Sequence, residues 1–358
     1  MTALGIVGAG VMGAGIAQVA LESGWEVLIH DVDPEAIDRA RERVREGLSK
    51  RAAKLELDAD TIDDWVDGRL VGLRHAHTLD GLGTEATLII EAVLEDLELK
   101  QTVFRALDAA APADVILATN TSALSVAAIA EAATTQPERV LGLHFFNPVP
   151  LMGLVEVVAG TRTSESVVER TIEIVTSWGK TPVRTADSPG FIVNRVNRPF
   201  TIEALRMLEE GAATIESIDA AMRDGGFPMG PFELMDLAGL DVNLAAARSI
   251  WVGLGRPDRL RPSPIQEQFV DAGRLGRKAG RGFYRYENGR RSTVDDPPAI
   301  ERPTGQRRIG PERIRQRIES AIVAEAHRAI DEGVAERDDI ATALRLGAGH
   351  PERFLGRL

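Results

Sequence analysis

Residues 4–33, LGIVGAGVMGAGIAQVALESGWEVLIHDVD, decide the fold of the first part of the chain. An apolar run at 4–7 leads into a glycine-rich turn and a helical stretch, and a second apolar run at 26–30 ends in Asp31. A buried strand, a helix and a second buried strand in that order are typical of a βαβ unit. The stretch therefore predicts the start of a parallel sheet covered by helices.

The turn of this stretch has the spacing G-x-G-x-x-G. The first glycine allows a tight turn, the second lets a pyrophosphate approach the backbone, and the third lets helix and strand pack closely. Asp31 would accept hydrogen bonds from ribose hydroxyls and repel a 2′-phosphate. An ordinary glycine-rich turn is the alternative, but the strand, helix and acidic residue in order favour a dinucleotide site that prefers NAD to NADP. The predicted turn contacts are Gly8, Gly10, Val11, Met12 and Gly13.

Strand-like and helix-like segments alternate up to about residue 187, with later apolar runs at 86–93, 114–120 and 139–146. This alternation predicts a Rossmann-type doubly wound α/β sheet, in which ligands bind beyond the carboxyl ends of the strands. Long amphipathic helices then replace the strands and predict an all-α C-terminal domain. The expected boundaries are 1–187 for the sheet domain, 188–287 for the helical domain, 288–311 for a linker and 312–358 for a further helical segment.

Composition limits the possible classes of function. The chain of 358 residues has a net charge of −12 and no cysteine, which excludes disulfides and disfavours nucleic acid as the main partner. It has no uninterrupted apolar window of about 18 residues, and its strand-like start leaves no room for a signal peptide. We therefore expect no membrane association and a cytoplasmic location. The six histidines are scattered, and no metal site is expected.

Two titratable side chains, His144 and Glu156, lie in the apolar stretch 143–158, LHFFNPVPLMGLVEVV. A lone histidine beside aromatic residues is more often a packed core residue than a catalyst. His144, however, ends a predicted strand and Ser122 follows another, so both lie at the edge of the sheet where ligands bind. This position favours a catalytic histidine, and the NPVP turn could return Glu156 to it.

Seven motifs in order give the chain a resemblance to the 3-hydroxyacyl-coenzyme A dehydrogenase family, close to its short-chain 3-hydroxybutyryl-CoA members. They are GAGVMGAGIAQVAL, EAVLEDLELK, NTSALS, GLHFFNPVPLM with LVEVV, DSPGFIVNR, FPMGPFELMDLAGLD and GRKAGRGFY, and they span about residues 3–287. The resemblance implies an NAD domain and a helical domain that forms a homodimer. It also implies reversible oxidation of an L-3-hydroxyacyl-CoA to the 3-oxoacyl-CoA.

The resemblance further implies roles for single residues. His144 is expected to be the general base that takes the proton of the 3-hydroxyl group while hydride leaves C3 for the nicotinamide, with Glu156 as its partner carboxylate. Ser122 and Asn194 are expected to hydrogen-bond the reacting end of the substrate. The expected cofactor contacts beyond the glycine-rich turn are Asp31, Glu95, Lys100, Asn120, Ser122, Asn147 and Lys278. A solvated surface position is the alternative for the two lysines.

A basic segment at 39–54 offers an attractor for the phosphates of coenzyme A in an acidic chain. Its seven basic residues outnumber its two acidic residues by five, although a charge run is usually only a solvated helix face. In the family this helical hairpin carries contacts to coenzyme A, and Lys54 matches one of them, while Ser122 is expected to contact the substrate as well. Two positions depart from the family pattern: Gly47 replaces a serine, and Gly153 replaces a lysine.

The segment 322–347 repeats 200–225 at a constant offset of 122 residues, which predicts a partial duplication of the helical domain. Gln316 stands where the first copy has Asn194, and no second histidine motif follows, so no second catalytic site is expected. Its apolar residues recur at helical spacing and should dock on the helical domain of the same chain or of a second subunit. The tail could replace a dimer partner or pack beside a dimer interface, and the truncated copy favours the retained dimer.

Two other functions remain open. A relative that oxidises a free hydroxy acid, such as a gulonate or carnitine dehydrogenase, would share the Rossmann and histidine features, but HFFNPVP and the basic helix argue against it. A non-catalytic NAD-binding structural protein would bind NADH without turnover. The set of Ser122, His144, Glu156 and Asn194 argues against that class.

Overall fold

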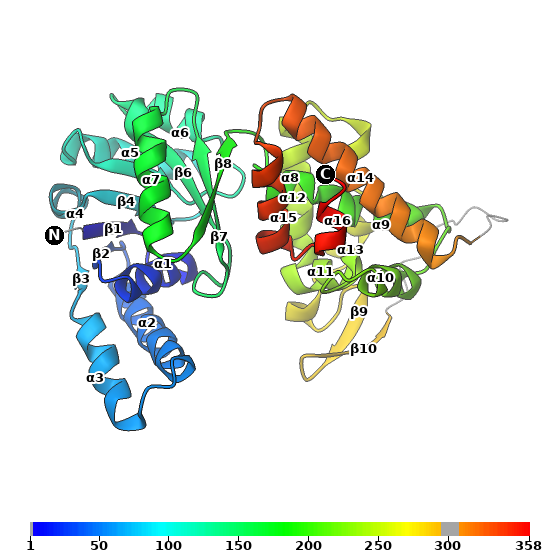
Figure 1. Ribbon diagram of the computed structural model, residues 1–358, viewed down its shortest axis with the longest axis horizontal. Helices are drawn as coiled ribbons and strands as arrows, with labels where there is room; N and C mark the ends of the chain where they lie inside the picture. Colours follow the sequence, from blue (N-terminus) through cyan, green and yellow to red (C-terminus); the bar gives the residue numbers. More distant parts are fainter. Residues whose placement is uncertain (1–2, 295–307) are drawn as a thin grey trace. The chain divides into compact units, whose positions relative to one another are not determined.

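The computed structural model describes residues 3–294 and 308–358. The chain forms two compact units, Met1–Ser188 and Pro189–Leu358, whose helices and strands are labelled in Figure 1. Within the described residues, no helix combines the length and the apolar character needed to cross a bilayer. Of the expected linker 288–311, residues 295–307 lie outside the described part of the chain.

The first unit is built on one eight-stranded sheet with the order β3-β2-β1-β4-β5-β6-β7-β8. The strands are β1 Ala3–Val7, β2 Glu26–His30, β3 Leu73–His75, β4 Leu88–Glu91, β5 Ile116–Thr119, β6 Val140–Phe145, β7 Leu154–Ala159 and β8 Thr181–Ala186. Neighbouring strands run parallel except β6 and β7, which are antiparallel. The order and the parallel pairing confirm the doubly wound sheet expected from residues 4–33.

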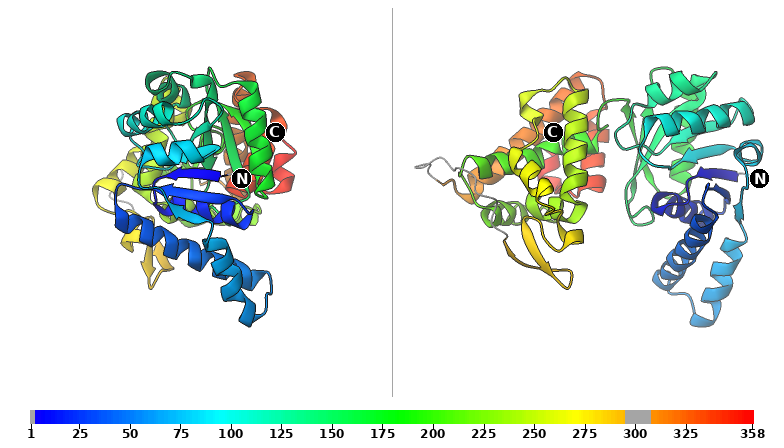
Figure 2. Two further views of the ribbon diagram at one scale, coloured as in Figure 1. Left: turned by 90° about the vertical axis from the view of Figure 1, so that its left-hand side faces the viewer. Right: turned by 180° about the vertical axis from the view of Figure 1, so that it is seen from behind.

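Helices cover both faces of this sheet. They are α1 Val11–Glu22, α2 Pro34–Lys54, α3 Ala59–Leu70, α4 Leu79–Glu85, α5 Leu97–Ala110, α6 Val126–Ala133 and α7 Glu165–Ser177. Along β1, Leu4 and Ile6 belong to the core with α1, α2 and α7, whereas Ala3 and Val7 belong to the core with α4, α5 and α6. Successive residues of a strand point to opposite faces, so one apolar run serves two cores. Helices α2 and α3 pair as a hairpin that projects from the sheet (Figure 2).

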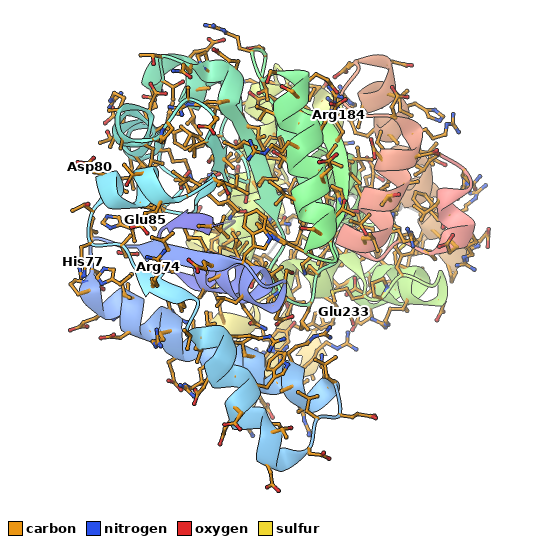
Figure 3. The ribbon with its side chains drawn as sticks, turned by 60° about the vertical axis from the view of Figure 1, so that its left-hand side comes forward. Arg74, His77, Asp80, Glu85, Arg184 and Glu233 are labelled. Atoms are coloured by element: carbon orange, nitrogen blue, oxygen red, sulfur yellow. The ribbon has the colours of Figure 1, made fainter. Side chains whose placement is uncertain are left out.

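The two edge strands of the sheet carry charged side chains. Arg74 on β3 lies 2.9 Å from Glu85 and 3.3 Å from Glu26, and Arg184 on β8 pairs with Glu165. Figure 3 labels Arg74, Glu85 and Arg184. Exposed charges on edge strands hinder pairing with another chain. These charged side chains therefore hinder pairing of another chain with the edges of the sheet. Because the ion pairs are well exposed, they contribute little to stability.

The second unit contains helices and one two-stranded hairpin. The helices are α8 Val193–Val196, α9 Arg198–Glu209, α10 Ile215–Asp224, α11 Pro231–Ala238, α12 Leu240–Gly253, α13 Pro264–Asp271, α14 Pro311–Asp331, α15 Arg337–Ala348 and α16 Glu352–Leu355. The antiparallel hairpin of β9 Tyr284–Glu287 and β10 Arg290–Val294 corrects the expectation of an all-α domain and of a linker from residue 288. Asn288 and Gly289 both have positive φ, 50° and 73°. An Asn-Gly pair of this kind favours a tight hairpin turn, and this was the overlooked signal.

The tail packs on the first helices of its own unit and repeats them. Helices α9 and α10 recur as α14 and α15, and α15 begins 122 residues after α10. Helix α14 packs against α8, α9 and α10, and α15 packs against α8. The predicted docking surface is therefore the helical unit of the same chain.

Two reciprocal sets of ion pairs join the copies. Each set links one arginine of one copy to two glutamates of the other. The pairs are Arg195 with Glu325 and Glu332, at 3.0 and 2.6 Å, and Arg317 with Glu203 and Glu210, at 2.8 and 2.6 Å. Every residue of one set lies 122 positions from its counterpart in the other. Such reciprocity is the mark of a two-fold contact, here made within a single chain.

His350 gives the docking of the tail a pH dependence. Its ring is 4% exposed, lies among Phe227 and Phe354, and has Nε2 2.9 Å from Oδ1 of Asn197. Burial lowers the pKa of this imidazole from 6.5 to about 3. The unfolded chain then takes up the proton first, so stability is complete above pH 6.5 and is lost as the pH falls toward 3.

Between pH 7 and pH 5 the expected loss from His350 is about 2 kcal/mol. Urea unfolding at both pH values should show that His350→Gln loses about 2 kcal/mol less than the wild type over this interval. An equal loss in both proteins would show that this histidine does not cause the acid sensitivity.

Candidate active site

His144 and Glu156 lie directly opposite each other in the antiparallel pair of β6 and β7. Nδ1 of His144 is 2.6 Å from Oε2 of Glu156, and the two residues are 4% and 0% exposed. Direct partners in such a pair point to the same face of the sheet. The chain reversal after β6 therefore brings a buried carboxylate to the ring.

Ser122 follows β5 and completes a line of three side chains. Its Oγ lies 3.1 Å from Nε2 of His144. When the Glu156 carboxylate accepts a hydrogen bond from Nδ1–H of His144, Nε2 of the neutral ring is left as a proton acceptor. The arrangement can therefore take a proton from a hydroxyl group that reaches Nε2.

The glycine-rich turn fits the pyrophosphate of a dinucleotide. A Cβ on Gly8, whose φ is 105°, would lie 2.6 Å from the main-chain oxygen of Ala92, and a Cβ on Gly13 would lie 1.9 Å from that of Gly8. Among the described residues, no atom lies within 4 Å of a Cβ built on Gly10, and no side chain caps α1. The N–H groups of the first turn of α1 are therefore available to phosphate oxygens.

Asp31 ties the second strand to this turn. Its Oδ2 accepts a hydrogen bond from the N–H of Ala9 at 2.7 Å, and its Oδ1 accepts one from the N–H of Asp33 at 3.0 Å. Val11 is 58% exposed beside the turn, whereas Met12 packs against the core. The carboxylate of Asp31, the expected contact to the ribose, is thus oriented by hydrogen bonds from the backbone.

The two asparagines expected at the cofactor have different surroundings. Oδ1 of Asn120 accepts a hydrogen bond from the N–H of Phe145 at 2.9 Å, so Asn120 fixes the strand end beside His144. Asn147 is exposed and lines a pocket next to α1 and α2. Asn120 therefore has a clear structural role, and Asn147 is the more accessible of the two.

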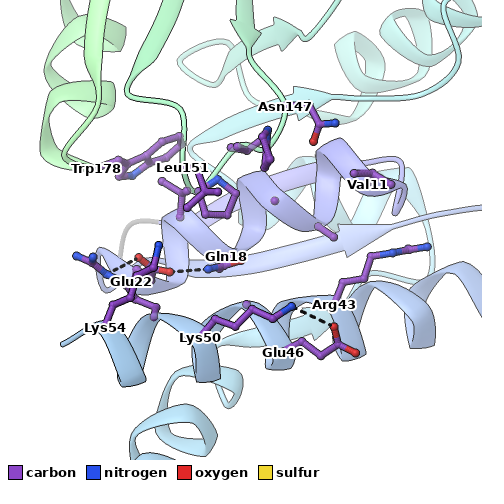
Figure 4. Close-up of a pocket in the computed structure, with 18 of the residues that line it drawn as sticks. Val11, Gln18, Glu22, Arg43, Glu46, Lys50, Lys54, Asn147, Leu151 and Trp178 are labelled. Atoms are coloured by element: carbon purple, nitrogen blue, oxygen red, sulfur yellow. Dashed lines mark hydrogen bonds and ion pairs between the residues drawn. The ribbon is translucent and has the colours of Figure 1, made fainter. Parts of the chain in front are cut away.

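That pocket has a volume of about 820 Å³ and lies between α1, α2 and the turn at 147–151 (Figure 4). Its basic lining comes mainly from the segment expected to attract coenzyme A. The basic residues are Arg43, Lys50, Arg51, Lys54 and Lys180, and the acidic ones are Glu22 and Glu46. The basic excess makes the pocket suitable for an anionic ligand.

Gln18 lies against Gly47, one of the two departures from the family pattern. A Cβ on Gly47 would lie 2.0 Å from Oε1 of Gln18, whose Nε2 donates to Glu22 at 2.7 Å. A serine at this position would therefore require the end of the Gln18 side chain to move. A Cβ on Gly153 would meet no described atom within 4 Å, and nothing in the structure explains that departure.

Lys100 is buried, which excludes the alternative of a solvated surface lysine. It is 1% exposed, and its Nζ donates to Oε1 of Glu91 at 2.7 Å. Glu91 was not among the predicted site residues, and no role was assigned to it. A carboxylate that ends an otherwise apolar strand run, ATLIIEAV, was the available signal.

Lys180 was missed as well. Its Nζ donates to the main-chain oxygens of Val149 at 2.7 Å and Met152 at 2.8 Å, so it closes the turn that joins β6 to β7. Burial lowers the pKa of this ammonium. The sequence carries no signal for these contacts, because they are made to backbone atoms about 30 positions away.

Two expected site residues, Asn194 and Lys278, belong to the second unit. Asn194 lies in α8, and Lys278 lies in a short 3-10 helix, Arg277–Ala279. Nζ of Lys278 is 2.7 Å from Oδ2 of Asp241, and its side chain is 49% exposed. Their roles toward substrate and cofactor stay predictions.

Comparison with known proteins decides the family. The family model described as 3-hydroxyacyl-CoA dehydrogenase, NAD binding domain, matches residues 3–188, and the C-terminal domain of the same family matches residues 190–286. The chain belongs to the 3-hydroxyacyl-CoA dehydrogenase family. It is thus an oxidoreductase that uses NAD to oxidise 3-hydroxyacyl-CoA, which confirms the resemblance seen in the seven motifs.

Relatives of this dehydrogenase differ in length and in named substrate. It is 47% identical to the 3-hydroxyadipyl-CoA dehydrogenase of Escherichia coli over 290 residues, which is 81% of this chain and 60% of that one. It is 41% identical to a probable 3-hydroxybutyryl-CoA dehydrogenase of Deinococcus radiodurans, over 79% of this chain and 99% of that one.

A crystal structure of 3-hydroxybutyryl-CoA dehydrogenase from Escherichia coli K12 matches with a TM-score of 0.87 and 36% identity. The match covers 98% of this chain and 89% of that one. The structure of (S)-3-hydroxybutyryl-CoA dehydrogenase from Ralstonia eutropha covers 80% of this chain, with a TM-score of 0.76 and 35% identity. The tail of this chain is therefore a feature shared with some of the similar structures.

Proposed function

We propose that the preferred substrate is a short-chain L-3-hydroxyacyl-CoA of the 3-hydroxybutyryl type, oxidised at C3. The line of Ser122, His144 and Glu156 is the observation that supports the proposed chemistry. Nε2 of His144 takes the proton of the 3-hydroxyl group as the C3–H bond breaks and the C3–O bond becomes a carbonyl. When bound, NAD accepts the hydride. Glu156 stabilises the imidazolium, while Ser122 and Asn194 hydrogen-bond the reacting oxygen.

The basic pocket supports a coenzyme A thioester as the substrate rather than a free hydroxy acid. Its lysine and arginine side chains suit the phosphates of coenzyme A, and Lys54 is the proposed contact to one of them. A free hydroxy acid has a single carboxylate and none of the phosphates that would occupy this pocket. A non-catalytic NAD-binding protein would have no use for a buried Glu156 carboxylate on the ring of His144.

Acyl preference is tested by NADH oxidation with 3-oxoacyl-CoA esters from four carbons upward, including a dicarboxylic one. We expect the highest kcat/KM at four carbons. A maximum at the dicarboxylic ester would instead assign the second candidate, a 3-hydroxyadipyl-type substrate, which the 47% identical relative supports by its name. A flat response to chain length would contradict both assignments.

Lys54→Glu should raise the KM for 3-oxobutyryl-CoA while leaving the KM for NADH unchanged. The substitution replaces an attraction to a phosphate by a repulsion, so the effect should be larger at low ionic strength. We expect roughly a tenfold rise in KM, since the lost attraction and the added repulsion at an exposed site are worth about 0.7 kcal/mol each. The matched substrate is a pantetheine thioester without the nucleotide, and an equal rise with that substrate would contradict a phosphate contact.

The tail bears on the proposed assembly. The sequence favoured a homodimer through the helical domain, but the face formed by α8 and α9 is covered by α14 and α15 of the same chain. We expect the tail to take the place of a partner subunit at this face, so that a homodimer would need another surface. Sedimentation should give the single-chain mass of 38.7 kDa. A stable species of twice that mass that disappears when α14 is removed would contradict this assembly.

Location and other partners complete the proposal. The cytoplasm is the expected compartment, and a net charge of −12 disfavours nucleic acid and anionic lipid as partners. Fractionation of producing cells tests the location, and activity in a membrane pellet would overturn it.

A further inference from the structure

Arg198 carries a buried guanidinium group that has no counter-charge in the described residues. It is the first residue of α9 and is 6% exposed. Its Nε makes no hydrogen bond, and no carboxylate in the described parts of the chain pairs with it. The other two described arginines that are buried, Arg139 and Arg195, pair with Asp108 and Glu325. Among these three arginines, a missing counter-charge is therefore specific to Arg198.

The burial of this group is unfavourable in the free protein. Burial lowers the pKa of the Arg198 guanidinium to about 10, so the group is still a cation at neutral pH. A charge that is removed from water without a partner destabilises a folded protein. Such a cost is typical of functional sites, where a ligand supplies the missing charge. The unpaired guanidinium therefore indicates an anionic ligand.

The position of Arg198 relates it to Asn194, which is expected to hydrogen-bond the reacting oxygen of the substrate. Asn194 lies in α8, one helical turn earlier in the chain. The chain between them is helical, because the N–H of Asn197 donates to the main-chain oxygen of Val193 at 3.0 Å and Asn197 has φ −81° and ψ −6°. Side chains four residues apart share a helix face, and long side chains lean toward the N-terminus of the helix. The Arg198 side chain is therefore directed toward the turn that carries Asn194.

The acyl chain is the part of the substrate that can supply this anion. The phosphates of the dinucleotide and of coenzyme A have their proposed receptors in the first unit, at the glycine-rich turn and in the basic pocket. A guanidinium binds a carboxylate through two parallel hydrogen bonds. Ile202, one turn further along α9, belongs to an apolar cluster with Ile250 and Leu260, and apolar surroundings strengthen the attraction between charges. A carboxylate on the acyl chain therefore fits this position.

We propose that Arg198 binds a carboxylate at the far end of the acyl chain, so that short dicarboxylic 3-hydroxyacyl-CoA esters are substrates beside the four-carbon type. Four helical residues span about 6 Å along the helix axis. In a six-carbon chain, three C–C bonds of about 1.5 Å each separate C3 from the terminal carboxylate and cover most of that length. The inference rests on the proposed function in placing the oxygen on C3 at Asn194, and it adds a residue that determines specificity.

The test compares matched esters with the full-length wild type and with Arg198→Met. Adipyl-CoA and hexanoyl-CoA have the same chain length and lack the 3-oxo group, so calorimetry measures their binding without any reaction. We expect Arg198→Met to raise the Kd of adipyl-CoA roughly 10- to 100-fold, the worth of a hydrogen-bonded charge pair, and to change the Kd of hexanoyl-CoA less than about threefold. The kcat/KM for 3-oxoadipyl-CoA should fall in proportion, while that for 3-oxohexanoyl-CoA should not.

Thermal unfolding gives a readout that needs no substrate. Because Arg198→Met removes an uncompensated buried charge, its thermal midpoint should rise by roughly 2–4 °C. Arg195→Met is the matched control, since it removes an equally buried guanidinium that is paired with Glu325 at 3.0 Å. Its midpoint should fall, while the ratio of the two Kd values stays that of the wild type. Arg198→Lys keeps the charge without the planar fork and should retain part of the preference for adipyl-CoA.

Three results would overturn the proposal. An equal rise in Kd for both esters would mean that Arg198 only orders the site. An unchanged Kd for adipyl-CoA in Arg198→Met would mean that the carboxylate binds elsewhere. A midpoint that falls as far as that of Arg195→Met would mean that the protein itself uses the guanidinium for stability. Absence of wild-type turnover with every thioester would count against the proposed function instead, and the Kd values of the two unreactive esters would still decide the role of Arg198.

Discussion

Replacing His144 by alanine is expected to lower kcat by roughly 10²–10⁴-fold, the usual worth of general acid–base catalysis. Nε2 of this histidine is the proton acceptor at the end of the line from Glu156, and Ser122 Oγ beside it is too weak a base to take its place. The Kd for NADH should stay within about twofold of the wild-type value, because the glycine-rich turn lies on other elements. Single-turnover reduction of 3-oxobutyryl-CoA and fluorescence titration with NADH measure the two quantities.

Glu156→Gln is the companion variant for the same prediction. The amide keeps the shape of the carboxylate but cannot stabilise an imidazolium at 2.6 Å, so turnover should also fall and its pH profile should shift. A loss below tenfold for His144→Ala would remove this histidine from the mechanism. If Glu156→Gln behaves like the wild type at all pH values, His144 can still be the general base, but Glu156 does not assist it.

Glu325→Gln is expected to destabilise the protein by about 3 kcal/mol, because it removes the buried counter-charge of a buried guanidinium and leaves it only the half-exposed Glu332. Arg195 is 0% exposed and Glu325 is 1% exposed. Glu325 also accepts a hydrogen bond from Nε of Arg259 at 2.6 Å. Urea unfolding of the full chain measures the change in the free energy of unfolding.

The internal two-fold supplies the matched control for this prediction. Glu203 occupies the position related to Glu325, but its partner Arg317 is 31% exposed. Solvent screens a pair of that kind, so Glu203→Gln should cost only about 1 kcal/mol. Equal losses for the two variants would contradict the view that the buried pair of Arg195 and Glu325 anchors the tail.

The features that the sequence predicts well are those with a local signal. The glycine spacing in residues 4–33, placed between a strand and a helix, indicates a tight turn, and Gly8 and Gly13 show it in their close approaches to main-chain oxygens. The repeat at offset 122 was visible, and the reciprocal ion pairs follow because Arg195, Glu203 and Glu210 all recur in the second copy as arginine or glutamate. Because the two copies pack around a two-fold, equivalent residues of the repeat form equivalent ion pairs.

Other features depend on segments that meet only in the folded chain. Gln18 and Gly47 touch across two helices, and no pattern within either helix indicates it. Lys100 is a middle case. Lys100 lies on the buried face of α5 with Val103, Phe104 and Leu107, so the helical periodicity predicts that it is buried. Its partner, the carboxylate of Glu91, becomes evident only in the folded sheet.

The β9–β10 hairpin was not predicted, although the sequence contains an Asn-Gly turn at its tip. The helical patterns up to residue 287 and the polar composition from residue 288 predicted a helical domain followed by a linker. The Asn-Gly turn between two short alternating runs is the stronger local evidence, because both residues adopt the positive φ that such a turn needs.

The most direct test of the account is steady-state NADH oxidation with 3-oxobutyryl-CoA and with free 3-oxobutyrate under the same conditions. We expect rapid turnover of the thioester and a kcat/KM for the free acid that is lower by at least about 100-fold, since the free acid has no coenzyme A to bind in the basic pocket. This expectation is contradicted if the free acid is used as well as the thioester, or if the enzyme binds NADH and turns over no 3-oxoacyl-CoA at all.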